Sequence, residues 1–120
     1  MVDVSTVALS GFNASEARLS AAANNIANAN TPAYRAQAVA QSTNKDGSVS
    51  TQFVAQNPPP PPTTTTNSAQ NVSQSPQQGN DVDIATDLVN ANFATYSAQA
   101  DLKVLKTQDQ LNKSLIDIQA

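Results

Sequence analysis

Cysteine, histidine and tryptophan are all absent from this sequence of 120 residues. Without cysteine the chain has no disulfide and no thiolate, and without histidine it lacks the side chain that most often acts as a general base or metal ligand. Apolar residues make up 39% of the chain and aromatic residues 4%, which is little material for a closed core at this length. These absences argue against an enzyme, a bound cofactor or metal, and a self-sufficient globular domain.

Positive charge is scarce as well, with six Lys and Arg residues against nine Asp and Glu, and a net charge of −3. No basic field is available for a phosphate backbone or an anionic lipid surface, so nucleic acid and membranes are not expected partners. The first basic residue is Arg18, and the charge-free run 19–34 is rich in asparagine. The sequence therefore predicts neither a cleaved secretory signal nor a membrane-spanning segment.

The middle of the chain has a different composition from its two ends. Of the 40 residues from 41 to 80, 32 are Gln, Ser, Thr, Asn, Pro or Gly. Such a segment cannot offset the entropy lost on folding, so an extended low-complexity linker is expected at 41–80. The proline run 58–62 predicts a polyproline II spacer rather than an SH3-type ligand, because no flanking basic residue sets an orientation. Residues 48–54 are compatible with a short strand.

The N-terminal segment 1–30 predicts a helix from Asp3 to about Asn28. Its apolar positions fall within about 100° of one another at the helical repeat. They are Val4, Ala8, Phe12, Leu19, Ala22 and Ile26. The residue before a proline avoids α geometry, so the run ending in Pro32 is expected to stop the helix and to begin an exit segment at 31–40.

The C-terminal segment 81–120 predicts a longer helix, from about Asp81 to Ile118, with two apolar stripes. The first stripe contains Ile84, Leu88, Ala91, Ala98, Leu102, Leu105 and Ile116. The second stripe contains Val82, Val89, Phe93, Tyr96, Ala100, Val104, Leu111, Leu115 and Ile118. Asp81, Asp83 and Asp87 lie where this helix begins and are interpreted as complements of its dipole, with Asn80 or Asp81 as the cap, because the spacing of an EF-hand loop is absent.

The two stripes predict which surfaces cover the apolar faces of the long helix. An all-α fold is expected, in which the N- and C-terminal helices pair as a helical hairpin or coiled coil and cover one stripe. The other stripe would remain in water in a monomer, so neighbouring chains are expected to cover it by helical polymerisation. A self-contained hairpin with a broad apolar face stays open as an alternative, since monomers do expose scattered apolar residues.

One motif in the sequence is highly specific. The run Asn24-Asn25-Ile26-Ala27-Asn28-Ala29-Asn30-Thr31-Pro32-Ala33-Tyr34-Arg35 closely resembles the N-terminal signature of bacterial flagellar rod and hook proteins. The stretch from Val82 to Ile118 is similar to the closing helix of that family. The middle segment is far too short for the outer domains of hook proteins, which favours a short rod-type member.

The chain departs from the family pattern at three positions. Ala33 stands where glycine is usual, and a positive φ there would strain the turn by about 1 kcal/mol. Tyr96 stands where arginine is common, and Ala98 where tyrosine is common. The aromatic side chain has moved by about 200° around the helix, so the family's contacts at this turn need not transfer.

The resemblance implies a structural subunit of the flagellar basal-body rod that polymerises through its terminal helices and transmits torque for motility. It also implies export from the cytoplasm through the flagellar export apparatus, without a cleaved signal, to the periplasmic rod. Expected partners are the chain itself and other rod or hook proteins. A helical export chaperone or adaptor of a type III secretion system remains the alternative.

Two groups of residues are predicted to matter for this role, and no catalytic residue is predicted. The assembly interface is expected to include Val4, Ala8, Phe12, Leu19, Ile26, Ile84, Leu88, Val89, Phe93, Tyr96, Leu102, Val104, Leu105, Leu111 and Leu115. The signature turn is expected to include Asn24, Asn25, Ile26, Asn28, Asn30, Thr31, Pro32 and Tyr34.

Overall fold

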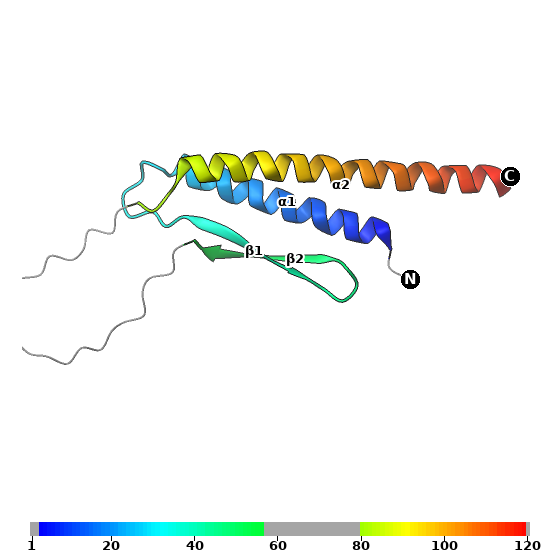
Figure 1. Cartoon of the computed structure of the whole chain (residues 1–120), viewed down its shortest axis with the longest axis horizontal. Coiled ribbons are helices and arrows are strands. Elements are labelled where there is room, and N and C mark those ends of the chain that lie inside the picture. The colour runs from blue at the N-terminus through cyan, green and yellow to red at the C-terminus, as the bar shows by residue number, and fades with distance from the viewer. Residues whose placement is uncertain (1–2, 57–79, 120) are drawn as a thin grey trace, which may run out of the picture.

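The computed structural model describes residues 3–56 and 80–119 (Figure 1). The elements follow in the order α1 (Val4–Ala27), β1 (Gln37–Thr43), β2 (Val49–Ala55) and α2 (Ile84–Gln119). Asp3 caps α1 by accepting a hydrogen bond of 2.9 Å from the Ser5 amide. No helix in the described ranges is long and apolar enough to cross a lipid bilayer.

The prediction of an all-α fold is wrong, because the two helices are accompanied by a two-stranded antiparallel sheet. Its register runs from the pair Gln37 and Ala55 at the open end to the pair Thr43 and Val49 beside the turn. Residues 41–55, expected as part of an extended linker, therefore lie mostly in a hairpin. The predicted polyproline spacer at 58–62 lies outside the described residues.

The turn of the hairpin is fixed by short polar side chains. Gly47 has φ of +80°, a conformation that glycine adopts without strain, and its amide donates a 3.0 Å hydrogen bond to the Asn44 carbonyl. Asp46 accepts hydrogen bonds from both the hydroxyl and the amide of Ser48, and the hydroxyl contact is the main reason that the pKa of Asp46 is lowered. Strand β2 lies where residues 48–54 were compatible with a strand, whereas β1 was not predicted, because an average composition over 40 residues hides such a local turn signal.

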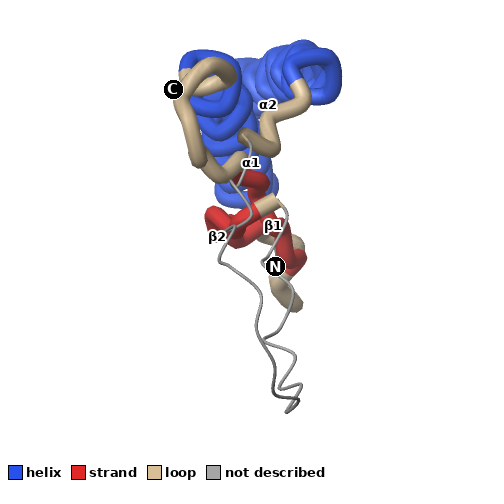
Figure 2. The backbone as a smooth tube through the Cα atoms, turned by 90° about the vertical axis from the view of Figure 1, so that its left-hand side faces the viewer, coloured by secondary structure: helices blue, strands red, loops and turns tan. Residues whose placement is uncertain are grey.

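The elements form three layers, with α1 between α2 and the hairpin (Figures 1 and 2). The hairpin is attached to α1 by polar contacts: the Val49 amide donates to the Ser10 hydroxyl at 2.9 Å, and the Arg18 guanidinium donates to the Gln41 side chain. Helix α1 therefore has two buried sides, one for each neighbour.

The core between these layers contains no large apolar side chain. The buried hydrophobic residues in the described ranges are all alanines, namely Ala8, Ala14, Ala21, Ala22, Ala36 and Ala94. Small side chains let backbones approach closely on both sides of α1, but they remove little apolar area from water. The described fold thus lacks the core that an independently stable domain of this size needs.

Helix α2 is much longer than its partner. At 1.5 Å per residue its 36 residues span about 54 Å, whereas the 24 residues of α1 span about 36 Å. The helices run antiparallel, so the C-terminal part of α2 extends beyond the N-terminal end of α1 (Figure 1). Among the described elements, none packs against that part of α2.

Candidate functional site

The contact between α1 and α2, called the seam below, is made of small and polar residues. On α2 most buried and half-buried positions recur every three or four residues, at Asp87, Ala91, Ala94, Ala98, Asp101, Leu105 and Gln108, and Ser97 is half-buried as well. Gly11 on α1 lies so close to Asp101 that a Cβ atom at residue 11 would come within 2.9 Å of the carboxylate. Across the middle of the seam, the Arg18 guanidinium lies 5.8 Å from the centre of the Phe93 ring.

The seam covers only part of the first stripe. Ala91, Ala98 and Leu105 are half-buried, whereas Ile84, Leu88, Leu102 and Ile116 remain 49–70% exposed. The expectation that the helix pair would cover one whole stripe therefore differs from the structure. The seam lies beside that stripe because Asp87, Ala94 and Asp101 occupy the positions that meet α1. Apolar periodicity does not include acidic residues, so these positions were not predicted.

The second stripe lies mostly on the sides of α2 that α1 does not cover, except that Phe93 faces Arg18, and its large side chains are exposed. The exposed fractions are 67% for Val89, 61% for Phe93, 71% for Tyr96, 42% for Val104, 54% for Leu111, 63% for Leu115 and 78% for Ile118. On α1, Ala8 is buried, Phe12 and Ile26 are half-buried, and Val4 and Leu19 are exposed. Leu9, Phe53 and Val54 are further exposed apolar residues, which the apolar periodicity did not indicate.

Asn25 is the polar centre of the signature turn and is fully buried. Its Nδ2 donates to the Gln37 carbonyl at 2.8 Å and to Asp87 Oδ1 at 3.0 Å. Its Oδ1 accepts from the Gln37 amide at 2.8 Å and from the Tyr34 hydroxyl at 3.4 Å. Every hydrogen-bonding position of this amide is used, and it joins the end of α1 to the first residue of β1 and the first turn of α2.

The end of α1 is held by a residue from the other end of the chain. The Asn80 Nδ2 atom lies 2.7, 2.9 and 2.9 Å from the carbonyl oxygens of Asn28, Ala29 and Thr31. These carbonyls lie just beyond Ala27, the last residue of α1, and those of Asn28 and Thr31 also accept from the amides of Thr31 and Tyr34. Asn80 therefore ties the turn after α1 to the segment that leads into α2. The helix ends at Ala27, ahead of Pro32, which is exposed, as are Asn24, Asn30 and Thr31. The proline is therefore not the residue that ends the helix.

The three aspartates at the start of α2 have three separate roles. Asp83 caps the helix, accepting from the amides of Ala85 and Thr86 at 3.0 and 3.2 Å, so the cap is neither Asn80 nor Asp81 as predicted. The Thr86 hydroxyl also donates to Asp83 and is the main cause of its lowered pKa. Asp81 accepts from the Ala36 amide and lies 3.5 Å from Arg35 Nε, while Asp87 meets Asn25.

Ala33 adopts a φ of +59°, and it is the one residue other than glycine with a positive φ in the described part of the chain. A Cβ atom in this conformation costs about 1 kcal/mol relative to glycine. The position that differs from the usual family residue is therefore a position of backbone strain.

Asp101 is half-buried in the seam, and its Oδ2 atom is buried without a hydrogen-bond partner. Burial raises the pKa of Asp101, because a carboxylate loses hydration beside Gly11 without gaining a donor. The apolar periodicity of α2 did not indicate this residue, because a charged residue is not part of an apolar stripe.

The described chain thus combines a pair of helices, a specific polar turn, a core of small residues and exposed apolar stripes. Residues 6–35, which contain most of α1 and the whole signature turn, match the family model described as flagella basal body rod protein. No curated protein matches the chain. The resemblance to flagellar rod proteins that the sequence shows is confirmed by this match, which covers the N-terminal quarter of the chain.

Proposed function

We propose that this chain is a subunit of the flagellar basal-body rod that assembles through its two helices with copies of itself and with other axial proteins, and that the assembled shaft transmits torque. The proposal is supported by the different residues that α2 presents to α1 and to the solvent. Mainly small and polar residues pack against α1, and the large apolar residues of both stripes other than the half-buried Leu105 are left in water.

The size of this exposed apolar set is unusual for a free monomer. Sixteen large hydrophobic residues are exposed in the described ranges, and eleven of them follow Asp83 on α2, whereas the buried hydrophobic residues are alanines. Contiguous apolar surface on a long helix is a property of interaction faces. Neighbouring subunits are the natural cover, since a tube of helices surrounds each helix on more than one side. The export-chaperone alternative receives no support from the family match.

Leu88→Asp and Val104→Asp test the two stripes separately in cells that lack the natural chain. Each change places a carboxylate where a neighbour is proposed to pack, which costs several kcal/mol when no partner is present. Both variants should abolish swimming while the chain is still exported. The matched control is Gln99→Asp, which adds the same charge at an exposed polar position of α2 and should swim normally.

Normal swimming of the Val104→Asp strain would show that the second stripe faces water in the rod. Loss of export in either variant would instead assign the stripe a role before assembly.

A further inference from the structure

Every second residue of the hairpin directs its backbone groups away from the partner strand. The Asn44 amide donates to the Ser48 carbonyl and the Gln56 amide to the Ala36 carbonyl, both at 2.8 Å, which fixes the pairs that exchange hydrogen bonds. The even-numbered residues of β1 and β2 therefore form the ladder, and the odd-numbered residues present their N–H and C=O groups at the two outer edges. These odd-numbered residues are Gln37, Val39, Gln41 and Thr43 on β1, and Val49, Thr51, Phe53 and Ala55 on β2.

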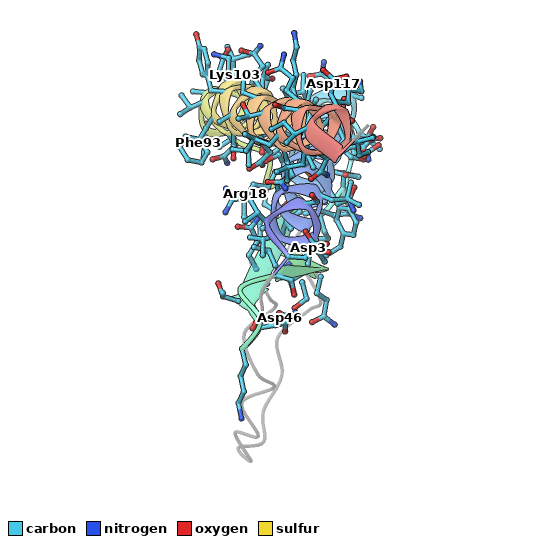
Figure 3. All side chains as sticks on the ribbon, turned by 90° about the vertical axis from the view of Figure 1, so that its right-hand side faces the viewer. Asp3, Arg18, Asp46, Phe93, Lys103 and Asp117 are labelled. Carbon is cyan, nitrogen blue, oxygen red and sulfur yellow. The ribbon has the colours of Figure 1, made fainter. Side chains whose placement is uncertain are left out.

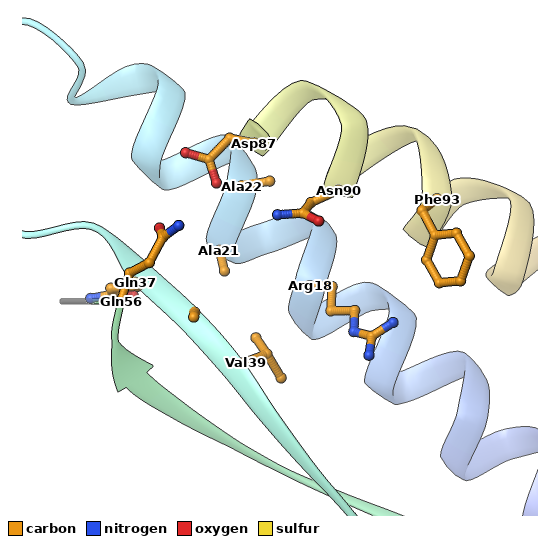
Figure 4. Close-up of a pocket in the computed structure, with 10 residues that line it drawn as sticks. Arg18, Ala21, Ala22, Gln37, Val39, Gln56, Asp87, Asn90 and Phe93 are labelled. Atoms are coloured by element: carbon orange, nitrogen blue, oxygen red, sulfur yellow. The ribbon is translucent and has the colours of Figure 1, made fainter. Parts of the chain in front are cut away.

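Helix α1 holds only one end of each outer edge, because it crosses the hairpin obliquely. At the open end of β1, Asn25 bonds both backbone groups of Gln37, and on β2 beside the turn the Ser10 hydroxyl accepts from the Val49 amide. Beyond Gln37, β1 borders a cavity of about 340 Å³ that Val39 lines, so α1 does not close over the strand there (Figure 4). Residues 39–43 of β1 and 51–55 of β2 are thus the free ends of the two edges.

Neither free end carries a feature that usually prevents another strand from adding. Strands β1 and β2 contain no charged residue, no proline and no glycine, and their register has no bulge. Natural edge strands are commonly protected by such features or by a covering element. Among the described elements only α1 packs against the hairpin, and Figure 3 shows Asp46, at the turn, on the opposite side of α1 from Lys103 of α2. The hairpin is therefore an outer layer with two edges open to pairing.

We propose that the free end of β2 pairs with the free end of β1 in a second copy of this chain, so that the hairpins of successive subunits join into one antiparallel sheet. This inference deepens the proposed function and rests on it, because it requires copies to assemble. Hairpins that point the same way bring β2 and the neighbouring β1 together antiparallel, as the two strands are within one copy. A contact between two different edges is head-to-tail and propagates along a helical filament, whereas β2 against β2 would close a dimer.

One register of this pairing uses only free backbone groups. It places Phe53 opposite Gln41, Thr51 opposite Thr43 and Ala55 opposite Val39 of the second copy. Each pair exchanges two hydrogen bonds, because all these residues face an outer edge. A sheet continued without a shift would instead bring Gln37 and Val49 into pairing, and α1 already holds their backbone groups. The register is therefore shifted by two residues, which displaces successive copies by about 7 Å along the strands.

Disulfide formation reads this register directly, since the chain has no cysteine. In the proposed sheet Gln52 lies opposite Ser42 of the next copy, in a pair without hydrogen bonds whose Cα atoms are about 4.5 Å apart, which suits a disulfide. Chains with Ser42→Cys and chains with Gln52→Cys are mixed, assembled and oxidised, and mass spectrometry identifies the linked peptides. We expect a mixed disulfide between the two variants.

Ser50→Cys is the matched control for Gln52→Cys. Residue 50 lies on the same face of β2 but only diagonally from residue 42 of the next copy, at about 7–8 Å, which exceeds the reach of a disulfide. Its yield of mixed disulfide with Ser42→Cys should be about tenfold lower.

A proline blocks one edge without breaking the hairpin, because the amides of the odd-numbered residues are not part of its ladder. Thr51→Pro in the Gln52→Cys chain removes an N–H from the edge of β2 and should lower the yield of mixed disulfide about tenfold. Thr43→Pro in the same chain makes the same replacement on the edge that this contact does not use, and should leave the yield unchanged. Moving the two prolines to the Ser42→Cys chain should reverse their effects.

Assemblies without a disulfide between residues 42 and 52, with equal yields from residues 50 and 52, or with prolines that act alike in both chains would overturn this inference and leave the proposed function standing. Absence of sedimenting assemblies in the unsubstituted protein would overturn both.

Discussion

The side-chain amide of Asn25 donates a hydrogen bond of 3.0 Å to the carboxylate of Asp87, which lies 62 residues later in the chain. Both residues are almost fully buried. This contact sets the register of the seam, because it fixes the end of α1 against the first turn of α2. The same amide holds both backbone groups of Gln37, so the hairpin is positioned by the residue that aligns the helices.

Asn25→Ala should therefore destabilise the helix pair by about 2–4 kcal/mol, since it leaves Gln37 and Asp87 without buried partners. The measurement is the protein concentration at which half of the helical circular dichroism signal appears, which should rise at least tenfold. Asn24→Ala is the matched control, because the Asn24 side chain is exposed on the same turn of α1. Equal effects of the two substitutions would refute the role assigned to the buried amide.

Asn80→Ala should weaken the pairing of the two ends more than Pro32→Ala does. Removal of the Asn80 side chain breaks its hydrogen bonds to the carbonyls of residues 28, 29 and 31 and costs about 1–3 kcal/mol. Pro32 is exposed and lies beyond the end of α1, so its replacement should change stability by less than about 1 kcal/mol. Hydrogen exchange of the amides in the last turn of α1 compares the two variants. Faster exchange in Pro32→Ala than in Asn80→Ala would contradict this assignment.

How far the sequence could predict this fold depends on the element. Both helices follow from apolar periodicity, and the signature turn follows from its asparagines and its resemblance to a family motif. Of the hairpin, only a possible strand at 48–54 was indicated. Strand β1 and the pairing were missed because the few apolar residues, such as Val39 and Val49, are diluted in a polar tract, and because the contacts that hold the hairpin come from Ser10 and Arg18 on α1. Such long-range polar contacts leave no periodic signal in a sequence.

The polar seam was missed for a related reason. Asp87 and Asp101 look like solvated residues of a helix, and their burial depends on Asn25 and Gly11 lying opposite them. A pattern in one helix cannot reveal which residues of the other helix it meets.

Ala33→Gly should leave stability unchanged or raise it by up to about 1 kcal/mol. The substitution removes the strain of a positive φ of 59°, and part of that gain is offset by the greater entropy of glycine in the unfolded chain. Ala29→Gly controls for the entropy, because Ala29 has no positive φ, and should destabilise by about 0.4–1 kcal/mol. Urea unfolding of the assembled protein gives both values; a loss of stability in Ala33→Gly would show that the turn does not hold the positive φ.

Asp101 should make the contact between α1 and α2 more stable as the pH is lowered. Burial raises the pKa of Asp101 in the folded chain above that of the unfolded chain. The folded state therefore binds the proton more tightly, and the seam gains stability as pH falls through the raised pKa and loses it as pH rises. Asp83, whose pKa is lowered mainly by the Thr86 hydroxyl, acts in the opposite direction, so the two effects must be separated by substitution.

Asp101→Asn performs that separation, because it keeps the shape and removes the charge. The variant should be more helical than the natural chain near neutral pH, and the difference should vanish as the pH is lowered through the Asp101 transition. The effect is small, since solvent reaches part of this carboxylate. A difference that grows on acidification would show that the charged form of Asp101 stabilises the seam, which is the opposite of what burial predicts.

The central claim is that contacts with neighbouring subunits stabilise the folded helices of this chain. Circular dichroism combined with sedimentation across a range of protein concentrations tests it most directly. Ordering about 60 helical residues costs about 1.5 kcal/mol each, which an alanine core cannot offset alone. We predict weak helicity in dilute solution that increases together with the formation of large sedimenting species. Strong helicity that is independent of concentration, in a monomer that melts cooperatively, would contradict the claim.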